Sequence, residues 1–225
     1  MKAIMISIKP QYVEKILNGE KTIEIRKTMP KCELPCKVYI YCTKPRKWWR
    51  YSSCGYTSDE LLWKTKDKIK MCDGFEFYYE MQDCIAINGK VVAEFMLNKV
   101  DTLERDLNDW LPKNRYDVSN ELLKDINLNQ NELWNYGQGK TLYAWHIDDL
   151  EIYDKPKELS EFYKNNYNKI IEQLEFDGCE EKHCKYAVGN SFLGDDGYCD
   201  YSMCPKLRLK IPPQSWCYVE ELENE

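Results

Sequence analysis

Residues 19–26, Gly-Glu-Lys-Thr-Ile-Glu-Ile-Arg, determine the predicted fold more than any other stretch of the chain. Asn18-Gly19 is typical of a helix end, because glycine readily adopts the left-handed backbone conformation found just after the last helical turn. From Thr22 to Arg26 polar and apolar residues alternate strictly, with isoleucines on one face and Thr, Glu and Arg on the other. This period of two predicts a strand whose faces meet different environments.

Similar patterns predict the elements around this strand. Residues 3–8 are typical of a buried strand, and Lys9-Pro10 starts a helix, since proline suits the first helical position. The apolar stripe of the helix that starts at Lys9-Pro10 is formed by Tyr12, Val13, Ile16 and Leu17. Residues 37–42 are a further predicted strand.

Further along the chain, Asn88-Gly89 lies between two β-prone runs within residues 84–95, which predicts a hairpin. Residues 142–152 are β-like. A helix is predicted from Pro156 to Leu174, where apolar residues recur at helical spacing. Residues 207–219 complete the predicted strands, with an interruption at Pro212-Pro213.

Three segments lie outside these elements. Residues 44–83 are interpreted as an insertion or long loop, and residues 98–140 as an acidic, helical insertion with a capping box at Asn129 and Glu132. Residues 178–205 form a cysteine-bearing loop. Because no internal repeat or low-complexity linker divides the chain, we expect a single domain over residues 1–225, of the α+β class.

The charge distribution indicates which half of the chain would bind an anion. The net charge of −6 argues against a protein that coats nucleic acid without specificity, because phosphate neutralisation needs a basic surface. Residues 1–99, however, carry 18 Lys and Arg against 12 Asp and Glu, while residues 100–225 carry 14 against 26. An anionic ligand is therefore expected in the first half.

The sequence also predicts a compartment. The apolar run at residues 3–8 is too short for a signal peptide core, and no run approaches the roughly 20 apolar residues of a membrane span. We therefore expect a cytoplasmic protein with no membrane partner. In a reducing compartment the 11 cysteines are expected to be core residues, metal ligands or reactive thiols rather than disulfides.

The polar face formed by Glu24 and Arg26 has two interpretations. It is either a solvated strand face with a surface salt bridge, or a buried face whose charges pair with each other or with a ligand. The alternation alone favours the solvated face, which is the commoner outcome for charges at this spacing.

Gly19, Lys21, Glu24 and Arg26 fill all four positions of the Gly-x-Lys-x-x-Glu-x-Arg signature of the ASCH domain, and the chain resembles this family of the PUA-like β-barrel superfamily. In that family the signature follows the first helix and lines a cleft in the barrel. The upstream Ser7-Ile8-Lys9-Pro10 and its helix are similar too.

The resemblance covers residues 1–42 and 84–97, and more weakly residues 142–150 and 212–219. It implies a PUA-like mixed β-barrel with flanking helices, helical insertions and a cysteine-rich loop.

The resemblance implies RNA, a nucleotide or a modified nucleoside as the ligand, since ASCH and other PUA-like domains are associated with RNA binding, modified-base recognition or catalysis. One branch hydrolyses acetylated cytidine with a Lys and a Thr from the signature plus a distant Glu. Lys21 matches that Lys, but Glu24 occupies the Thr position, and Thr22 is the nearest hydroxyl on the same face. We therefore prefer recognition of a base, modified or not, in the cleft.

Two alternatives remain open. One is an enzyme, an amidohydrolase or a ribonuclease, with Lys21 and Glu24 as catalytic residues. The other is a protein-interaction module, which would need the cleft to be filled by side chains.

In the binding interpretation, Lys21 and Arg26 hold a phosphate or a base edge, and Glu24 accepts a hydrogen bond from an exocyclic amine. A tryptophan would stack on the base, although a buried core position is the more frequent one for a tryptophan in a strand. The remaining candidates for ligand contact are Lys9, Thr43, Trp145, Ser215 and Trp216.

Residues 44–50 interleave cations with aromatic residues, a combination that suits the phosphates and stacked bases of a single strand. The alternative is a solvated loop whose tryptophans cap the barrel. The candidate nucleic-acid contacts are Lys44, Arg46, Lys47, Trp48, Trp49 and Arg50.

The loop at residues 178–205 contains a candidate zinc site. Four residues separate Cys179 from Cys184, and four separate Cys199 from Cys204. Two such pairs fit a structural tetrahedral zinc, which would replace the core that the loop lacks. His183 could take the place of one sulfur, and free thiols are the alternative. The remaining cysteines show no comparable pairing.

Overall fold

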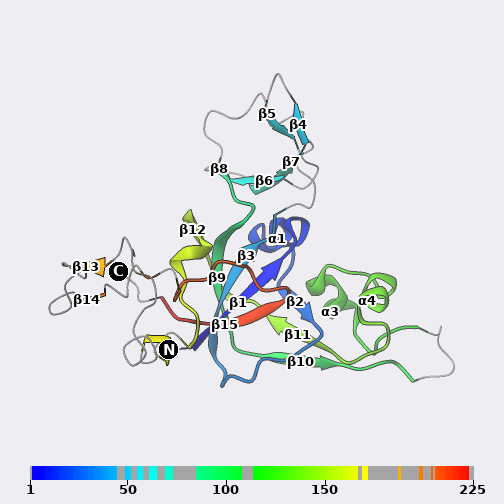
Figure 1. The fold of residues 1–225 in the computed structure, drawn as a ribbon. Helices are drawn as coiled ribbons and strands as arrows, with labels where there is room; N and C mark the ends of the chain where they lie inside the picture. Colours follow the sequence, from blue (N-terminus) through cyan, green and yellow to red (C-terminus); the bar gives the residue numbers. More distant parts are fainter. Residues whose placement is uncertain are drawn as a thin grey trace.

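The computed structural model describes residues 2–44, 49–51, 55–57, 61–64, 69–72, 85–107, 114–166, 169–171, 187–188, 198–199, 204 and 206–222. In these residues the chain is a mixed α+β fold, built on two sheets that share an apolar core and are flanked by short helices (Figure 1).

The larger sheet has five strands in the order β12-β9-β3-β1-β15. Among the described strands of this sheet, β1 and β3 are parallel, and the other neighbours are antiparallel. The strands are β1 (Lys2–Ile8), β3 (Cys36–Cys42), β9 (Lys90–Leu97), β12 (Asp148–Glu158) and β15 (Trp216–Glu220). The predicted strands at residues 3–8 and 37–42 are therefore confirmed, and they lie side by side.

The smaller sheet has three antiparallel strands in the order β10-β11-β2. Strand β2 (Ile23–Arg26) carries the signature, and β11 (Leu142–His146) and β10 (Val100–Leu103) follow it across the sheet. In the register, Glu24 lies opposite Trp145 and Arg26 opposite Tyr143. These four side chains consequently share one face, since side chains directly opposite each other project to the same side of a sheet.

Within the described residues, three α-helices of seven or eight residues flank the sheets. α1 (Pro10–Leu17) starts at the predicted proline, and Gly19 follows its end with a positive φ of 74°. α3 (Asn120–Ile126) and α4 (Gln130–Gly137) lie beside β2 and β11 (Figure 1), and the predicted capping box of Asn129 and Glu132 is present. A 3₁₀ turn, η2 (Leu159–Glu161), follows β12.

The remaining strands are short and lie at the periphery. Where residues 44–83 are described, they contain strands rather than only loop. The elements are β4 (Trp49–Tyr51), β5 (Gly55–Thr57), β6 (Leu61–Lys64), β7 (Ile69–Cys72), β8 (Ile85–Ala86), β13 (Ala187–Val188) and β14 (Tyr198–Cys199).

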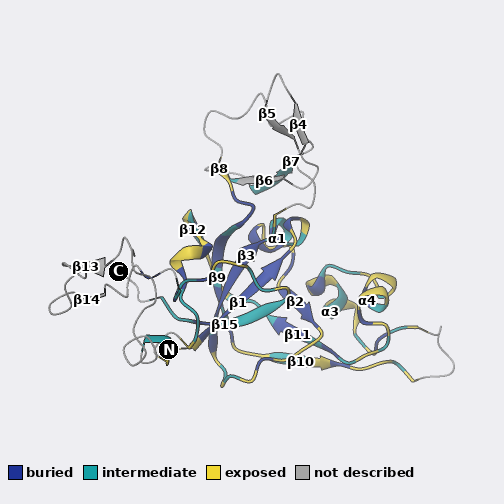
Figure 2. Cartoon of the chain, in the orientation of Figure 1, coloured by how far each residue is buried: buried dark blue, intermediate teal, exposed yellow. Residues whose placement is uncertain are grey.

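Alternation along β1 sends its side chains into two different cores. Ile4 and Ile6 pack with Phe95 and Trp145 between the two sheets. Met5, on the other face, packs with residues that include Phe162 of the segment after η2. Full burial of such a side chain contributes roughly 1.5–3 kcal/mol, so these two layers hold the larger sheet in place. Figure 2 shows the resulting buried centre.

The Asn88-Gly89 turn is present, but the predicted hairpin around it is wrong. β8 pairs with β6, whereas β9 pairs with β3 and β12, so the turn passes the chain from one sheet to another. The buried Asn88 side chain explains the difference: its Oδ1 accepts from the Leu62 amide at 2.6 Å, and its Nδ2 donates to the Thr43 carbonyl at 3.1 Å. The Asn88 side chain thus bonds to the backbone of two other segments, and β8 and β9 do not pair with each other as a hairpin.

The predicted helix from Pro156 to Leu174 is wrong over residues 156–166. β12 continues through Pro156 to Glu158, and an isolated bridge joins Tyr163 to Arg208. The apolar residues that matched a helical stripe are used differently, because Leu159 and Phe162 are buried against the outer face of the large sheet. Residues 169–171 are helical, and residues 172–174 lie outside the described residues.

The described strands form separate sheets and do not close into one barrel. The α+β class is confirmed, while the expected barrel closure is not seen in these residues. None of the helices in the described ranges is both long and apolar enough to cross a membrane.

Candidate functional site

The signature strand is held in place by its isoleucines. Ile23 and Ile25 are buried against residues from α3, α4 and β11, including Ile126 and Leu133. Because side chains alternate along a strand, Glu24 and Arg26 must then face the other way, toward the interior between the sheets. All four residues of β2 are buried.

Lys21, Glu24 and Arg26 form one ionic group, called the signature cluster below. The Glu24 carboxylate lies 3.0 Å from Arg26 Nη2 and 3.6 Å from Lys21 Nζ. Only 2% of Lys21, 8% of Glu24 and 7% of Arg26 is exposed. The interpretation of this face as a solvated one is therefore wrong, and the charges pair with each other as burial requires.

The cluster also joins segments that are far apart in sequence. Lys21 Nζ donates to the Ile126 carbonyl at 2.5 Å, at the C-terminal end of α3, where a cation is favoured. Arg26 Nη2 donates to the Ser7 carbonyl at 2.9 Å, and Nη1 contacts Ser215 Oγ at 3.4 Å. The signature residues thus connect β1, α3 and the segment before β15.

Burial changes the acid–base chemistry of Lys21. Loss of solvent around the ammonium lowers the pKa of Lys21 below its ordinary 10.5, and the charges of Arg26 and Lys15 act in the same direction. The charge and hydrogen bond of Glu24 oppose this shift without cancelling it. A lysine with a lowered pKa loses its proton more readily, as a general base requires.

Two buried N–H donors near the cluster have no acceptor among the described residues. They are Arg26 Nε and the Trp145 indole Nε1. An unpaired buried polar group costs about 1–3 kcal/mol, so each can gain from an acceptor brought by a ligand. Both belong to the shared face of β2 and β11, because Trp145 lies opposite Glu24 in the register.

The two candidate stacking residues differ in exposure. Trp145 is fully buried in the core, whereas Trp216 is half-buried, and their ring centroids lie 5.9 Å apart. Trp216 Nε1 donates to Thr28 Oγ1 at 2.9 Å, which orients its ring. Stacking on a base is therefore open to Trp216, while Trp145 can offer only its N–H.

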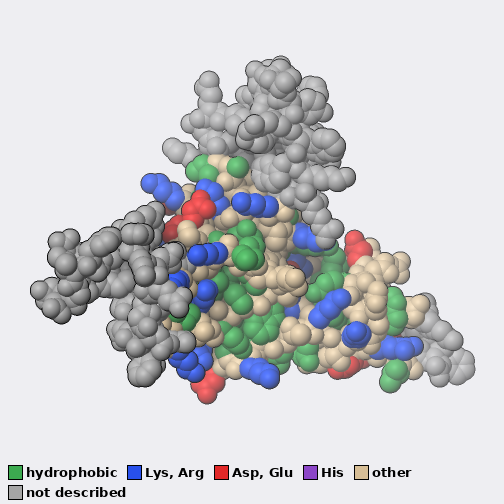
Figure 3. All heavy atoms as spheres, in the orientation of Figure 1, with side chains coloured by type: hydrophobic (Ala, Val, Ile, Leu, Met, Phe, Trp, Pro, Cys, Tyr) green, Lys and Arg blue, Asp and Glu red, His purple; other side chains and the backbone are tan. Residues whose placement is uncertain are grey.

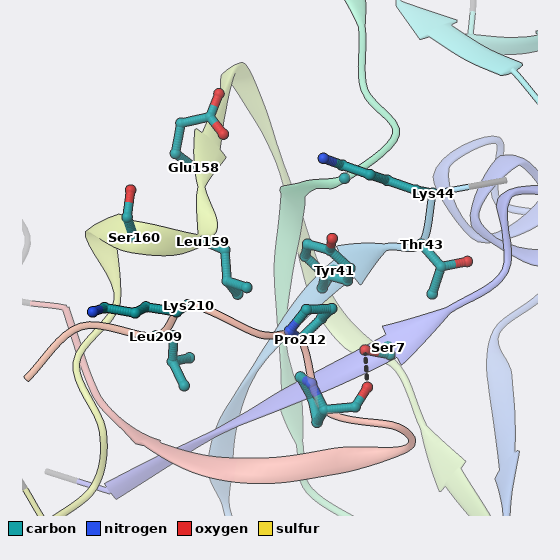
Figure 4. A pocket seen from close by; sticks show the side chains of 12 residues that line it. Ser7, Tyr41, Thr43, Lys44, Glu158, Leu159, Ser160, Leu209, Lys210 and Pro212 are labelled. Carbon is teal, nitrogen blue, oxygen red and sulfur yellow. Dashed lines mark hydrogen bonds between the residues drawn. The ribbon is translucent and has the colours of Figure 1, made fainter. Parts of the chain in front are cut away.

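The structure brings some of the other predicted residues to the cluster and not others. Ser215 contacts Arg26, as described above. Lys9 is exposed at the start of α1, Thr22 is exposed beside β2, and neither contacts the cluster in the described structure. Thr43 lines a hollow on the opposite face of the larger sheet (Figure 4).

Two predicted sites fall largely outside the described residues. Of the basic and aromatic segment, Lys44 is exposed and described, Arg46, Lys47 and Trp48 lie outside the description, and Trp49 and Arg50 are described only as backbone in β4.

The zinc prediction remains a prediction. Cys179 and Cys184 lie outside the described residues, Cys199 is described only as backbone in β14, and Cys204 is buried. In the described part of the chain, no group of three or more metal-binding side chains is found.

Two contacts of the cluster, and one cysteine pair elsewhere in the fold, had no signal in the sequence pattern. Ser7 and Ile126 act through backbone carbonyls, which any residue type offers. Cys32 and Cys36 showed no notable pairing in sequence, yet their Sγ atoms lie 3.0 Å apart. Burial raises the pKa of the Cys36 thiol, and its hydrogen bond with Cys32 adds to this.

The fold and the site therefore define an α+β protein with an ASCH signature on a buried strand face. A protein from Zymomonas mobilis, the "ASCH domain-containing ribonuclease", is 37% identical to this chain over 46 residues. The match covers 20% of this chain and 31% of that relative. This match and the complete signature together support an ASCH domain in this chain.

Solved structures that match this chain in a structural comparison also come from Zymomonas mobilis. The crystal structure of its ASCH protein is 14% identical, covers 97% of this chain and 88% of its own, and has a TM-score of 0.44. A single-residue variant of that protein is also 14% identical, with 98% and 92% covered and a TM-score of 0.43. No family model matches the chain.

Proposed function

We propose that this protein binds RNA and holds one nucleotide at the signature cluster. The observation that carries the proposal is the buried ionic group of Lys21, Glu24 and Arg26, with two unpaired N–H donors on the same sheet face. The relative from Zymomonas mobilis is named a ribonuclease, which supports RNA as the ligand class. We also propose that the recognised base can be a modified one and that the fold belongs to the PUA-like superfamily.

The roles of the residues follow from their hydrogen-bonding capacity. Arg26 Nε and Trp145 Nε1 donate to oxygen atoms of a phosphate or a base, because both are donors only. Glu24 accepts from an exocyclic amine, and Trp216 stacks on the base. A phosphate that approaches Lys21 and Arg26 would compete with Glu24 for the same cations.

Entry of a ligand requires movement of one wall. The three signature side chains are each less than a tenth exposed, so a base cannot reach them in the conformation described. The segment at residues 212–216 contacts the cluster through Ser215, and none of its residues is buried, so it is the wall that we expect to move. A protein-interaction module would need the cleft to be filled by side chains, and the near closure of the cluster agrees with that alternative. RNA binding by the wild type distinguishes the two.

An enzymatic function is the second candidate, favoured by the lowered pKa of Lys21. In this version Lys21 takes the proton of the attacking group and Glu24 exchanges protons with it. The reaction would be hydrolysis of RNA or of a modified nucleoside. A structural zinc at Cys179, Cys184, Cys199 and Cys204 and a cytoplasmic location remain separate proposals.

The test is binding of fluorescent single-stranded RNA and of a panel of modified nucleosides, with product analysis on the same samples. The site variant is Lys21→Met with Arg26→Gln, which retains most of the side-chain volume while removing both charges. The matched control is Lys2→Ala with Lys31→Ala, which removes the same charge from two exposed positions. Thermal melting of each variant shows whether it is folded.

We expect the site variant to lose binding at least tenfold more than the control. Loss of binding without product supports recognition, and product formed by the wild type but not by Lys21→Met promotes the enzymatic version. Equal RNA binding by the site variant and the control would overturn the proposal.

A further inference from the structure

A hollow of about 600 Å³ opens on the face of the larger sheet that points away from the signature cluster. It lies between that sheet and two segments at residues 158–160 and 209–213, and Figure 4 shows its lining. The alternation in β1 and β3 explains the separation, because Ser7 and Tyr41 share the face of Met5 and Tyr39. Lys21, Glu24 and Arg26 do not line it. It is called the outer hollow below.

The Tyr41 hydroxyl is the best-defined polar group of the outer hollow. Only 3% of Tyr41 is exposed, and its hydroxyl points toward the space between Glu158 and Lys44 (Figure 4). No partner for this hydroxyl exists among the described residues. Burial raises the pKa of Tyr41, with further contributions from Cys42 and Glu158, so the hydroxyl keeps its proton. A hydroxyl that faces the hollow and makes no hydrogen bond among the described residues is available to an acceptor on a ligand.

The rim of the outer hollow is positively charged. Lys44 and Lys210 are exposed, and neither is paired with a carboxylate in the described part of the chain. Glu158, the one acidic residue of the rim, lies 3.0 Å from Lys90 and is therefore already neutralised. Lys44 extends over Gly89, whose lack of a side chain leaves room for it. The unpaired charges favour an anion.

The walls of the outer hollow suit a flat ring. Leu159, Leu209 and Pro212 present apolar side chains beside the Tyr41 ring. On the face shown in Figure 3, Lys and Arg side chains surround apolar side chains over the central sheet. An anionic group and a flat ring together describe a nucleotide, whose phosphate meets the lysines and whose base meets the apolar wall.

Ser7 connects the outer hollow to the signature cluster. Its backbone carbonyl accepts from Arg26 at 2.9 Å, and its hydroxyl donates to the Pro213 carbonyl of the hollow wall at 2.7 Å. The segment at residues 212–215 continues from that wall to Ser215, which contacts Arg26. Lys44 is also the first residue of the basic and aromatic segment at residues 44–50. Ser7 and the segment at residues 212–215 therefore link the two sites, which are neighbours in the fold.

We propose that the outer hollow binds a second nucleotide of the same RNA strand, with Lys44 and Lys210 on the phosphates that flank it and with the Tyr41 hydroxyl donating a hydrogen bond to the nucleotide. This inference rests on the proposed function and makes it more specific, because the ligand becomes an oligonucleotide rather than a free nucleoside. Mononucleotides engage one site, and longer strands engage both.

The experiment compares the affinities for a mononucleotide, a trinucleotide and a ten-residue single-stranded RNA over a range of salt concentrations. The hollow variants are Lys44→Ala with Lys210→Ala, and Tyr41→Phe, which removes only the hydroxyl. The Lys2→Ala, Lys31→Ala protein is the charge-matched control. We expect the double lysine variant to bind the ten-residue RNA at least tenfold more weakly than the control. Its log affinity should also fall less steeply with log salt, by about 0.7 for each lysine that contacts a phosphate.

Each outcome separates this proposal from the proposed function. Weaker binding of the longer RNAs by the hollow variants, with unchanged mononucleotide affinity, supports a second subsite. Hollow variants that match the control, while Lys21→Met with Arg26→Gln loses binding, overturn the outer hollow alone. The reverse pattern overturns the signature cluster as the RNA site and leaves the hollow. No binding of any RNA by the wild type overturns both.

Discussion

The charged side chains of the signature cluster and of the outer hollow are compensated in different ways, by ion pairing in the cluster and by solvent in the hollow. In the cluster, one carboxylate pairs with two cations, and each of the three residues is less than a tenth exposed. In the hollow, Lys44 and Lys210 are exposed and carry no carboxylate partner within the described residues. A buried charge must be compensated by the protein itself, whereas an exposed one is compensated by water until a ligand arrives. The cluster is therefore closed in the conformation described, and the hollow is open to ligand.

The largest difference between the two regions is expected in stability. Glu24→Ala leaves Lys21 and Arg26 buried without their counter-charge, and loss of one partner of a buried pair costs about 3–5 kcal/mol. Glu158→Ala at the hollow removes an ion pair whose carboxylate side chain is 57% exposed, which costs at most about 1 kcal/mol. Urea denaturation measures both. Similar losses of unfolding free energy in the two variants would show that the charges of the cluster are no more dependent on each other than those of the hollow.

A smaller effect is expected from two glycines. Gly19 and Gly89 have φ values of +74° and +80°, so an alanine at either position is strained by about 1–2 kcal/mol. Nothing lies within 4 Å of an added Cβ at Gly19, but at Gly89 the Cβ would lie 2.3 Å from Lys44 Cε. Both variants should lose similar stability, and only Gly89→Ala should weaken binding of the longer RNAs by displacing Lys44.

This pair separates backbone strain from the position of Lys44. If Gly19→Ala weakens RNA binding as much as Gly89→Ala does, the effect is general destabilisation, and Lys44 has no specific role. Chemical denaturation and RNA titration of the same two preparations make the comparison.

The pH dependence of stability tests the burial of Lys21. Because burial lowers its folded-state pKa, the unfolded chain binds more protons at Lys21 between that pKa and 10.5. The free energy of unfolding of the wild type relative to Lys21→Met should therefore rise with pH in this window, by up to about 1.4 kcal/mol for each pH unit. Denaturation curves of both proteins from pH 7 upward measure the difference. A difference that stays constant or falls would show that Lys21 is not desolvated.

The smallest effect is expected where the two regions meet. Ser7→Ala removes the hydrogen bond from the Ser7 hydroxyl to the Pro213 carbonyl, while the carbonyl that accepts from Arg26 remains. Stability should fall by about 0.5–1.5 kcal/mol. If the wall at residues 212–215 couples the two sites, this variant should weaken the longer RNA more than the mononucleotide, as fluorescence titration can measure.

Local sequence patterns predicted the secondary structure correctly where the pattern depends only on residues close in sequence. The proline at the start of α1, the glycine after it and the alternation in β2 each act through near neighbours, and each is confirmed. The helix expected at residues 156–174 failed over residues 156–166, because Leu159 and Phe162 pack against Tyr39 and its neighbours across the sheet. The spacing of apolar residues predicts that their side chains are buried. It does not predict which element they pack against, or whether the segment itself is a helix.

For the candidate site, the identities of Lys21, Glu24 and Arg26 were visible in the sequence, because the signature specifies residue types at fixed spacing. Whether those charges were solvated or buried was a tertiary question, settled by α3 and by the larger sheet that closes over β2. The outer hollow has no sequence pattern, since only the fold brings the segments at residues 158–160 and 209–213 to Tyr41 and Lys44. Short-range order follows from backbone preference and side-chain period, while charge compensation and cavities depend on contacts between residues far apart in the chain.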